Sequence, residues 1–401
     1  MSSRRALYVW QARYPWDVRV EKVCLALQSL GYDVELLARK AEGEADTEIV
    51  GGIRTVRVGP AIPSPFSLPV PGNPVWRLAI EASLRRQRPD VVIVRDIPLA
   101  LPVAAACGRL GIPWAIDMAE HYPEAMRTWK KYQAHPASRL LVNTLKLPDR
   151  VERHAVRAAD AIFPVCEDMR ERLVREHGCF PDRIVPVLNT PSRERWRAIP
   201  ERPPGYQGTR FCYHGVVIGD RDLETVVAGF DLAAKDDPAI SLLIAGGGES
   251  LDDVRRLAES AVHKDRIALT GRFQPGELDR LYSETDFGVV SWKVNEFTHN
   301  TIANKFFDYA ACGRPFIYAA TRSMRRLMGR MQCGEAYQGD DPASVAAAMH
   351  ALRRGDYAAM AAAGRAAVDT EFNWEADVVR LGDALDRLCA QGHLERATRT
   401  A

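Results

Sequence analysis

The stretch 300–317 combines residue types that can bind a phosphorylated ligand. Asn304 and Lys305 stand at a predicted helix start, where a lysine ammonium and unpaired backbone N–H groups can together hold a diphosphate. Asp308 follows one turn later on the face of Asn304, so its carboxylate can accept hydrogen bonds from ribose hydroxyls. A Gly-Arg-Pro sequence then ends the helix. In the alternative interpretation this is an ordinary capped helix, and Lys305 and Asp308 are solvated.

Three consecutive glycines, Gly246, Gly247 and Gly248, follow an apolar run and precede the helical pattern 251–260. Glycines at the carboxyl end of a strand let a ligand approach the backbone, and the start of the next helix offers N–H groups to an anion. The spacing is neither G-x-G-x-x-G nor a Walker A loop. A tight turn that binds no ligand explains the three glycines equally well.

Short strand-like apolar runs alternate with helical patterns along both halves of the chain, which predicts βαβ units and parallel sheets. The predicted strands are 7–10, 34–37, 91–94, 114–116, 161–164 and 184–186 in the first half, and 210–214, 241–245, 267–269, 287–290 and 315–318 in the second. Six prolines between 60 and 74 predict a surface loop. We therefore predict an α/β fold with two Rossmann-like, doubly wound domains.

Composition suggests where these domains meet. A stretch rich in proline, glycine and charge at 191–208 is typical of a linker. It separates a predicted first domain, 1–190, from a second domain, 209–373, and a helical segment, 374–401, follows. No fixed-period repeat is present, which excludes a solenoid.

The overall composition is that of a globular protein, with 47% hydrophobic and 26% charged residues among 401. No apolar tract reaches the roughly 18 residues that span a bilayer. The apolar run after the basic start stops after five residues, so we predict a first strand there rather than a signal peptide. Eight cysteines lack any C-x-x-C pair, which predicts buried thiols in a reducing cytoplasm and no structural zinc.

The net charge of +2 hides an asymmetry between the two halves. Residues 1–200 hold 30 Lys and Arg against 23 Asp and Glu, whereas 201–401 hold 24 against 29. A basic first half indicates an anionic partner, such as a phosphate-bearing substrate or a membrane surface. Chance distribution over two solvated surfaces explains the difference as well.

Several motifs follow one another along the second half in a definite order. They are Tyr-His-Gly at 213–215, the three glycines, Leu-Thr-Gly-Arg-Phe with Arg272 and Phe273, Glu-Leu-x-x-Leu-Tyr at 277–282, Thr-Asp at 285–286, and Asn-Lys-Phe-Phe-Asp from Asn304. This order resembles the nucleotide-binding half of family 4 glycosyltransferases. In the first half, Asp-Val-Arg-Val at 17–20 is similar to the D-P-R-V start of one branch of that family. The resemblance rests on the order of these motifs along nearly the whole chain, because no single motif would suffice to identify the family.

The resemblance implies the glycosyltransferase B fold, in which two Rossmann-like domains face a cleft. It implies that the C-terminal domain holds the nucleotide-sugar donor and that the last helix crosses back to the first, acceptor-binding domain. Cations near the diphosphate would stabilise the leaving nucleotide, so neither a metal nor another cofactor is expected. Asp308 matches the second acid of the E-x7-E motif and would bind ribose. The donor-binding residues expected from the resemblance are Arg221, Gly246, Gly247, Gly248, Arg272, Phe273, Asn300, Asn304, Lys305 and Asp308.

The second half departs from the family at one position. Asn300 stands where the first acid of E-x7-E belongs, and Glu296 lies one turn before it. This change leaves the contacts to the donor sugar open.

The first half departs at the D-x-H-E-x-x-P-E loop, which occurs here as 117–124. Ala119 takes the histidine position, Glu120 is retained and His121 is displaced by two. If it faces the cleft, Glu120 contacts the acceptor hydroxyl or acts as its base. Alternatively, it is a buried carboxylate that caps the loop.

These similarities assign catalytic roles to Glu120, His121 and Lys305, and they place Arg19 with Glu120 on the acceptor side. Family 4 enzymes mostly retain the anomeric configuration, with the departing phosphate oxygen helping to deprotonate the acceptor. A committed base such as Glu120 would instead fit inversion, so the stereochemistry stays open.

The hypothesis is a cytoplasmic, hexosyltransferase-like enzyme of polysaccharide biosynthesis. It would transfer a sugar from a nucleotide sugar to a glycan, lipid-linked or small-molecule acceptor, with retention and without a metal. The alternatives are a non-catalytic sugar-nucleotide-binding or scaffolding paralogue and a nucleotide-sugar epimerase of the same fold. Dispersed basic residues and the lack of a recognised module argue against nucleic acid as a partner.

The stretch 129–146 combines aromatic, basic and apolar residues. Such a stretch can rest on an anionic bilayer and present a lipid-linked acceptor, which predicts peripheral contact with the inner face of the cytoplasmic membrane. A solvated helix that covers the acceptor site is the alternative.

Overall fold

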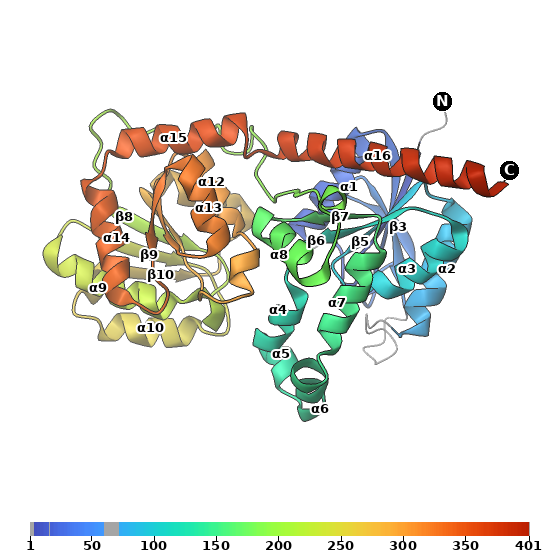
Figure 1. Ribbon diagram of the computed structural model, residues 1–401. Coiled ribbons are helices and arrows are strands. Elements are labelled where there is room, and N and C mark those ends of the chain that lie inside the picture. The colour runs from blue at the N-terminus through green and yellow to red at the C-terminus, as the bar shows by residue number, and fades with distance from the viewer. Residues whose placement is uncertain (1–3, 16, 60–71, 401) are drawn as a thin grey trace. The chain divides into compact units, whose positions relative to one another are not determined.

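The structure is a computed structural model that describes residues 4–15, 17–59 and 72–400 (Figure 1). The chain divides into two compact units. Unit 1 consists of Met1–Leu188 and Val378–Ala401, and unit 2 consists of Asn189–Asp377. The predicted surface loop at 60–74 lies outside the described residues except for its last three positions.

Within the described residues, unit 1 contains a seven-stranded sheet in the order β3-β4-β2-β1-β5-β6-β7. The strands are β1 (Arg4–Val9), β2 (Tyr32–Arg39), β3 (Thr47–Val50), β4 (Ile53–Val58), β5 (Val91–Arg95), β6 (Trp114–Met118) and β7 (Ala161–Pro164). They pair in parallel, except for β3 with β4. The strand order reverses between β1 and β5. Parallel sheets bind ligands at the carboxyl ends of the strands at such a reversal.

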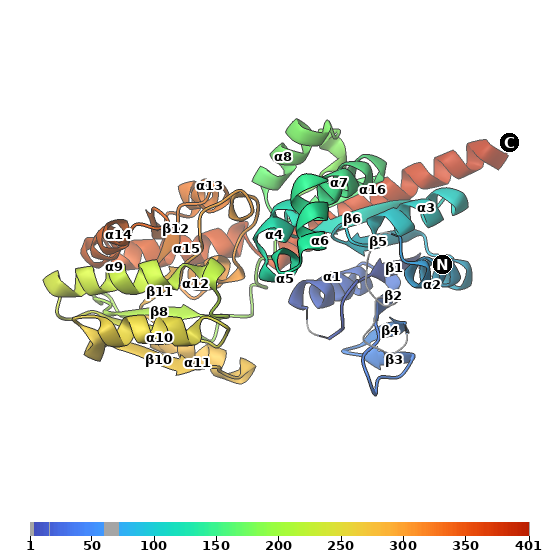
Figure 2. The same cartoon turned by 90° about the horizontal axis from the view of Figure 1, so that it is seen from below.

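The hairpin of β3 and β4 lies at one edge of this sheet (Figure 2) and has no counterpart among the predicted strands. Its turn uses Gly51 and Gly52 at φ 57° and 81°, as a tight two-residue hairpin requires. Strand β3 is half exposed, and β4 is mostly buried but is interrupted by Arg54, Thr55 and Arg57, so neither forms an apolar run. Conversely, the predicted strand 184–186 forms only an isolated bridge from Ile184 to Ile162. Val185 and Val187 donate to the carbonyls of Ile162 and Pro164, but Pro164 has no N–H to donate in return.

Helices cover the sheet of unit 1. They are α1 (Val18–Ser29), α2 (Pro74–Gln87), α3 (Ala100–Leu110), α4 (Tyr122–Thr128), α5 (Lys130–Gln133), α6 (Pro136–Arg139), α7 (Leu147–Ala158) and α8 (Glu167–His177), with a π-helical turn η2 (Leu140–Thr144) after α6. The last helix, α16 (Trp374–Thr400), begins in unit 2 and continues in unit 1 from Val378. There Asp386 forms an ion pair with Arg4.

Unit 2, whose whole backbone is described, contains a six-stranded parallel sheet in the order β10-β9-β8-β11-β12-β13. The strands are β8 (Arg210–His214), β9 (Ser241–Ala245), β10 (Ile267–Gly271), β11 (Phe287–Val290), β12 (Phe316–Ala319) and β13 (Gly334–Tyr337). The strand order reverses between β8 and β11. The predicted strands of this half all form, and only β13, which is four residues long and half exposed, was not predicted.

The helices of unit 2 are α9 (Leu223–Asp236), α10 (Leu251–Ser260), α11 (Leu278–Glu284), α12 (Asn304–Ala311), α13 (Arg322–Met331), α14 (Pro342–Arg354) and α15 (Tyr357–Thr370). Helix α9 packs against α10 and α14, and α15 packs against α12 and α13. These are the two helical layers of a doubly wound domain.

The stretch 191–208, which has a linker's composition, packs onto unit 2. Arg202 donates to the backbone carbonyls of Ser283 and Thr285 and to the carboxylate of Asp286. Trp196 is buried against the ring of Tyr282, with the ring centroids 4.4 Å apart. These contacts hold the stretch in place along the domain that it precedes.

The composition led to two expectations, that the cysteines are buried thiols and that no apolar segment spans a bilayer. All eight cysteines lie among the described residues and are buried free thiols, as predicted. No helix in the described part of the chain is long and apolar enough to cross a bilayer.

Candidate active site

The loops after β8 and β9 lie against each other at the carboxyl edge of the unit 2 sheet. The Gly215 N–H donates to the Ala245 carbonyl at 2.9 Å, and the Val217 N–H donates to that of Gly247 at 3.0 Å. A Cβ on Gly246 would lie 1.8 Å from the Gly215 oxygen, and one on Gly248 would lie 2.0 Å from the Val217 oxygen. The close approach of the two loops therefore requires these glycines, whether or not a ligand binds beside them.

The side chain of Lys305 reaches this edge from the first turn of α12. Its Nζ donates to the His214 carbonyl and lies 3.6 Å from the centroid of the Tyr213 ring. Burial and the positive charge of Arg221 hold the pKa of the Lys305 ammonium well below its usual value. Among the described residues, no carboxylate lies within ion-pair distance of Lys305.

Arg221 lies in the turn after β8, in a 3-10 helix of residues Gly219–Arg221. Its guanidinium carbon is 5.2 Å from the centroid of the Trp292 ring, and in the described part of the chain it forms no ion pair either. Two cations without carboxylate partners are thus close together where the strand order reverses. An anionic ligand would relieve their repulsion.

Burial keeps His214 neutral at the end of β8. Desolvation and the charge of Lys305 hold the pKa of its imidazole well below the usual value. Its Nε2 is 2.7 Å from the Tyr282 hydroxyl, and its ring meets that of Phe273 edge to face at 6.2 Å. Arg272, next to Phe273, is exposed and covers Gly247 with its side chain.

The structure brings Asn304 and Asp308 to the same helix as Lys305. Asn304 is exposed, and its Oδ1 accepts a hydrogen bond from the Asn189 amide at 2.8 Å. Asp308 is half-buried, and its Oδ1 accepts a hydrogen bond from Trp196 Nε1 at 2.8 Å. The helix starts at Asn304 as predicted.

Asn300, which the resemblance places at the donor site, lies in the loop before α12. Its side chain is completely buried, and its Nδ2 donates to the Glu296 carbonyl at 2.7 Å. This hydrogen bond stabilises the loop, and the buried Oδ1 of Asn300 has no hydrogen-bond partner among the described residues, so its contact with a donor stays a prediction. Glu296 is itself exposed and forms an ion pair with Arg322 at 2.9 Å.

Arg19, which the resemblance places on the acceptor side, makes internal contacts in unit 1. Its guanidinium is buried and donates to Asp117 from Nε at 2.8 Å and from Nη2 at 2.6 Å, and to the Val187 carbonyl. Asp117 also accepts the Tyr8 hydroxyl at 2.6 Å. Arg19 therefore neutralises an internal carboxylate, as a buried charge requires.

Glu120 and His121 follow β6, next to the reversal of the unit 1 sheet. Glu120 is half-buried, and its negative charge contributes to raising the pKa of Tyr122 and of Tyr132. His121 is buried and lies near Glu152, which forms an interior ion pair with Arg172. Glu120 is thus the better placed of the two for a ligand.

Sequence analysis missed Arg95 and Asp96 at the end of β5. Both are buried, and the pKa of the Asp96 carboxyl is raised to about 7 by burial and by the charges of Glu120 and Asp117. A charged pair directly after an apolar strand is the signal that could have found them.

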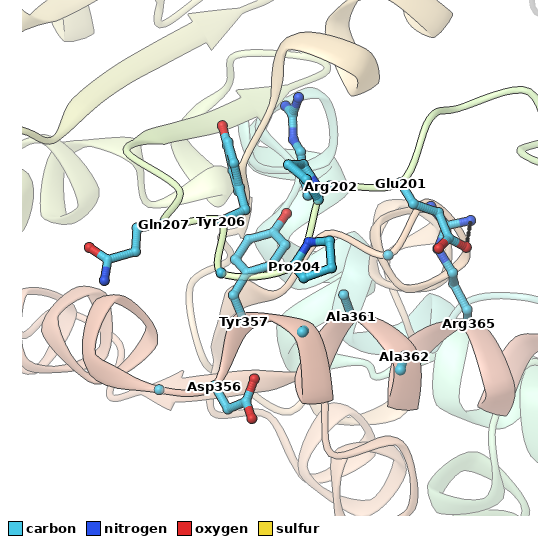
Figure 3. Close-up of a pocket in the computed structure, with 15 residues that line it drawn as sticks. Glu201, Arg202, Pro204, Tyr206, Gln207, Asp356, Tyr357, Ala361, Ala362 and Arg365 are labelled. Carbon is cyan, nitrogen blue, oxygen red and sulfur yellow. Dashed lines mark ion pairs between the residues drawn. The ribbon is translucent and has the colours of Figure 1, made fainter.

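Figure 3 shows a different concavity of unit 2, of about 480 Å³, between the segment 201–207 and the start of α15. Its arginines are paired, Arg365 with Glu201 at 3.4 Å and Arg202 with Asp286 at 2.9 Å. None of the predicted donor-binding residues lines this concavity. The candidate donor site therefore stays at the carboxyl edge of the unit 2 sheet.

Comparisons with known proteins agree with this geometry. A protein-family model described as "Glycosyl transferase 4-like domain" matches residues 17–190, and one described as "Glycosyl transferases group 1" matches residues 210–354. Sucrose-phosphate synthase from Thermosynechococcus elongatus superposes with a TM-score of 0.74 at 18% identity, over 97% of this chain and 100% of that chain. HepE from Anabaena, solved with UDP and glucose, gives 0.68 at 9% identity, over 96% and 100%.

The fold and the site together define a glycosyltransferase enzyme with the glycosyltransferase B fold, as predicted. This chain belongs to the family 4-like glycosyltransferases. Among curated proteins, the alpha-monoglucosyldiacylglycerol synthase of Streptococcus pneumoniae is 23% identical over 121 residues, 30% of this chain. The matched stretch spans only 26% of that protein's length. The D-P-R-V branch stays a prediction.

Proposed function

We propose that this glycosyltransferase takes a hexose from a nucleoside diphosphate sugar bound at the carboxyl edge of the unit 2 sheet. The observation that carries the proposal is the pair of cations, Lys305 and Arg221, that lie near each other without carboxylate partners. A diphosphate supplies the missing negative charge. HepE, which has the same fold, was solved with UDP.

In the proposed reaction the bond between the sugar C1 and the phosphate oxygen breaks, and its electron pair goes to the β-phosphate. Lys305 and Arg221 stabilise the charge that develops there. This is the task that a divalent cation performs in other enzymes, so we propose transfer without a metal. Asp308 would accept hydrogen bonds from the ribose, with Trp196 holding its Oδ1.

We propose that an acceptor hydroxyl, bound by unit 1 near Glu120, forms the new bond to C1 and passes its proton to the departing phosphate. The anomeric configuration is then retained. The name of the pneumococcal relative records an alpha-glucoside product. Glu120 would orient the acceptor hydroxyl as a hydrogen-bond acceptor.

We further propose that the acceptor is presented at an anionic membrane. Helices α5 and α6 project beyond the ends of α4 and α7 (Figure 1). Leu140, Leu141 and Leu145, in and just after η2, are 44–52% exposed, although leucine is usually buried. Exposed Arg139 and Lys146 flank them, so the projection offers apolar side chains between cations.

The test is an assay of purified protein with UDP-glucose and other nucleotide sugars, with and without candidate acceptors. Release of nucleotide that depends on the acceptor, together with a product that contains the sugar, supports transfer. Proton NMR of the anomeric signal decides between retention and inversion. A change of the donor sugar without any acceptor would indicate an epimerase. The absence of any product with every donor would favour a non-catalytic binding subunit.

A further inference from the structure

We propose that Trp196 is a positioning residue of the donor site: it fixes the orientation in which the carboxylate of Asp308 meets the ribose of a bound nucleotide. The inference deepens the proposed function, in which Asp308 binds the ribose hydroxyls, and it rests on that role. Trp196 lies in the stretch 191–208, whose composition predicted only a linker. Its contacts make this stretch a part of the donor-binding unit.

The indole of Trp196 contacts Asp308 directly. Its Nε1 donates to Oδ1 of Asp308 at 2.8 Å, and the Trp196 side chain is buried. An indole has a single N–H donor and no acceptor, so the position of the ring decides which oxygen it meets. A hydrogen bond to an ionised acceptor is roughly twice as strong as one between neutral groups, so this contact restrains the rotation of the Asp308 carboxylate.

Two neighbours hold the indole ring in place. The ring of Tyr282 packs against it edge to face, with the centroids 4.4 Å apart, and the guanidinium carbon of Arg195 lies 3.8 Å from its centroid. Arg195 itself forms an ion pair with Asp279 at 2.9 Å. A buried ring with close neighbours has few other rotamers open to it, so its N–H stays directed at Asp308.

A buried arginine fastens the backbone after Trp196 to the helix that carries Asp308. Arg314 donates to three backbone carbonyls at 2.9–3.2 Å, those of Tyr282, Cys312 and Pro200. Cys312 follows the last residue of α12. One guanidinium therefore joins the stretch 191–208 to α11 and to the end of α12. The Gly-Arg-Pro sequence thus does more than end the helix, because its arginine keeps Trp196 and Asp308 in register.

The same aromatic contacts lead to the lysine proposed to hold the diphosphate. The hydroxyl of Tyr282, whose ring packs on Trp196, is 2.7 Å from Nε2 of His214. The His214 carbonyl accepts a hydrogen bond from Lys305 Nζ. One nucleotide must place its ribose at Asp308 and its diphosphate at Lys305 together, so a loosened carboxylate should weaken binding through the ribose.

The test measures by calorimetry the affinities for UDP, GDP and ADP and for their dideoxy analogues, which lack both ribose hydroxyls. Trp196→Phe keeps an aromatic ring against Tyr282 but has no N–H to donate. We expect W196F to weaken binding of the ribonucleotide that the wild type binds best by about five- to tenfold, and binding of its dideoxy analogue by less than about twofold. Asp308→Ala should show the same selective loss, and the double variant should lose no more than Asp308→Ala alone.

Tyr357→Phe is the matched control. Tyr357 is buried in the same unit, and its ring packs on Tyr206 of the same stretch with the centroids 5.6 Å apart. Its hydroxyl donates to the Asp286 carbonyl at 3.1 Å. The variant therefore also loses a buried hydrogen bond, but it should keep the wild-type ratio between the two affinities.

A second measurement uses the wild type alone and does not depend on the folding of a variant. The indole N–H resonance of Trp196 should move in the NMR spectrum when the ribonucleotide binds, and it should move less when the dideoxy analogue binds. Equal shifts with both ligands would overturn the positioning role.

The outcomes separate this inference from the proposed function. Equal losses for the ribonucleotide and its dideoxy analogue in W196F, or a ribonucleotide affinity that is unchanged or higher, would overturn the role of Trp196 alone. Wild-type affinities for both ligands in Asp308→Ala would instead overturn the ribose contact of Asp308, and the role of Trp196 with it. Failure of every nucleoside diphosphate to bind the wild type would overturn the donor site as a whole.

Discussion

The Nζ of Lys305 lies 3.6 Å from the centroid of the Tyr213 ring and donates to the carbonyl of the next residue, His214. The face of an aromatic ring attracts a cation but does not neutralise it. The pKa of Lys305 is accordingly held well below its usual value by burial and by Arg221. An anion bound beside Lys305 would favour its charged form and raise this pKa again.

The first prediction is that binding of a nucleoside diphosphate takes up a proton. The phosphate charge raises the pKa of Lys305 back toward its usual value, so the complex binds this proton more tightly than the free protein does. The affinity for the nucleoside diphosphate should therefore fall as the pH rises above the pKa that Lys305 has in the free protein. Calorimetry in buffers of different ionisation enthalpy measures the uptake. Lys305→Gln should abolish it, and uptake that survives in this variant would assign the proton to another group.

The second prediction concerns the packed glycine loop. Gly246→Ala places a methyl group 1.8 Å from the Gly215 oxygen, and we expect it to lower the free energy of unfolding by at least about 2 kcal/mol. Gly329→Ala is the matched control, because that glycine lies in α13 with nothing within 4 Å, and alanine should stabilise the helix by up to about 1 kcal/mol. Urea denaturation measures both. Equal stability of the two variants would mean that the loops can separate without cost.

The third prediction concerns the buried ion pair of Glu152 with Arg172. Arg172 and His177 hold the pKa of Glu152 at about 2. Glu152→Gln leaves the buried Arg172 with only the exposed Glu176 as an acidic partner and should cost about 3–5 kcal/mol at pH 7.

The Glu152 effect should depend on pH with a known sign. A carboxyl group whose pKa is lowered by folding stabilises the protein above its ordinary pKa, and this stabilisation is lost as pH falls from about 4.5 toward 2. The gap between the wild type and Glu152→Gln should therefore shrink over that interval. Glu176→Gln is the control, because the exposed Glu176 reaches Arg172 at 3.3 Å and should cost less than about 1 kcal/mol.

The fourth prediction tests the leucine surface of unit 1. Replacing Leu140, Leu141 and Leu145 together by serine should reduce sedimentation with vesicles that contain phosphatidylglycerol. The wild type should bind them better than vesicles of phosphatidylcholine alone, because Arg139 and Lys146 add electrostatic attraction. A control replaces Leu232, which is 49% exposed on α9 of unit 2. Unchanged sedimentation of the triple variant would contradict a role of these leucines in membrane binding.

The sequence predicted the fold well because its signals were local. Apolar runs bounded by turns located most of the strands, and the helix start at Asn304 and Lys305 was predicted. The strands β3 and β13 were not predicted because half-exposed strands lack an apolar run, and β4 was not predicted because two arginines and a threonine interrupt its apolar residues.

The site was harder to predict, because residue type does not show which side chains are buried. Arg19 and Asn300 stand at motif positions, yet one neutralises Asp117 and the other braces the Glu296 loop. Asp96 carries no motif, and its contact with Ala119 depends on the pairing of β5 with β6. Such contacts between distant segments are visible only once the chain has folded.

The measurement that tests the central claim most directly is a titration of the protein with UDP, GDP, ADP, dTDP and CDP, followed by thermal shift and calorimetry. Lys305→Ala is compared with Lys264→Ala, an exposed lysine at the amino end of β10. The account predicts that one nucleotide stabilises the wild type and Lys264→Ala, and that Lys305→Ala loses at least about tenfold in affinity, as expected for a lost charge-assisted contact. No stabilisation by any nucleotide at millimolar concentration, or equal binding by both variants, would contradict it.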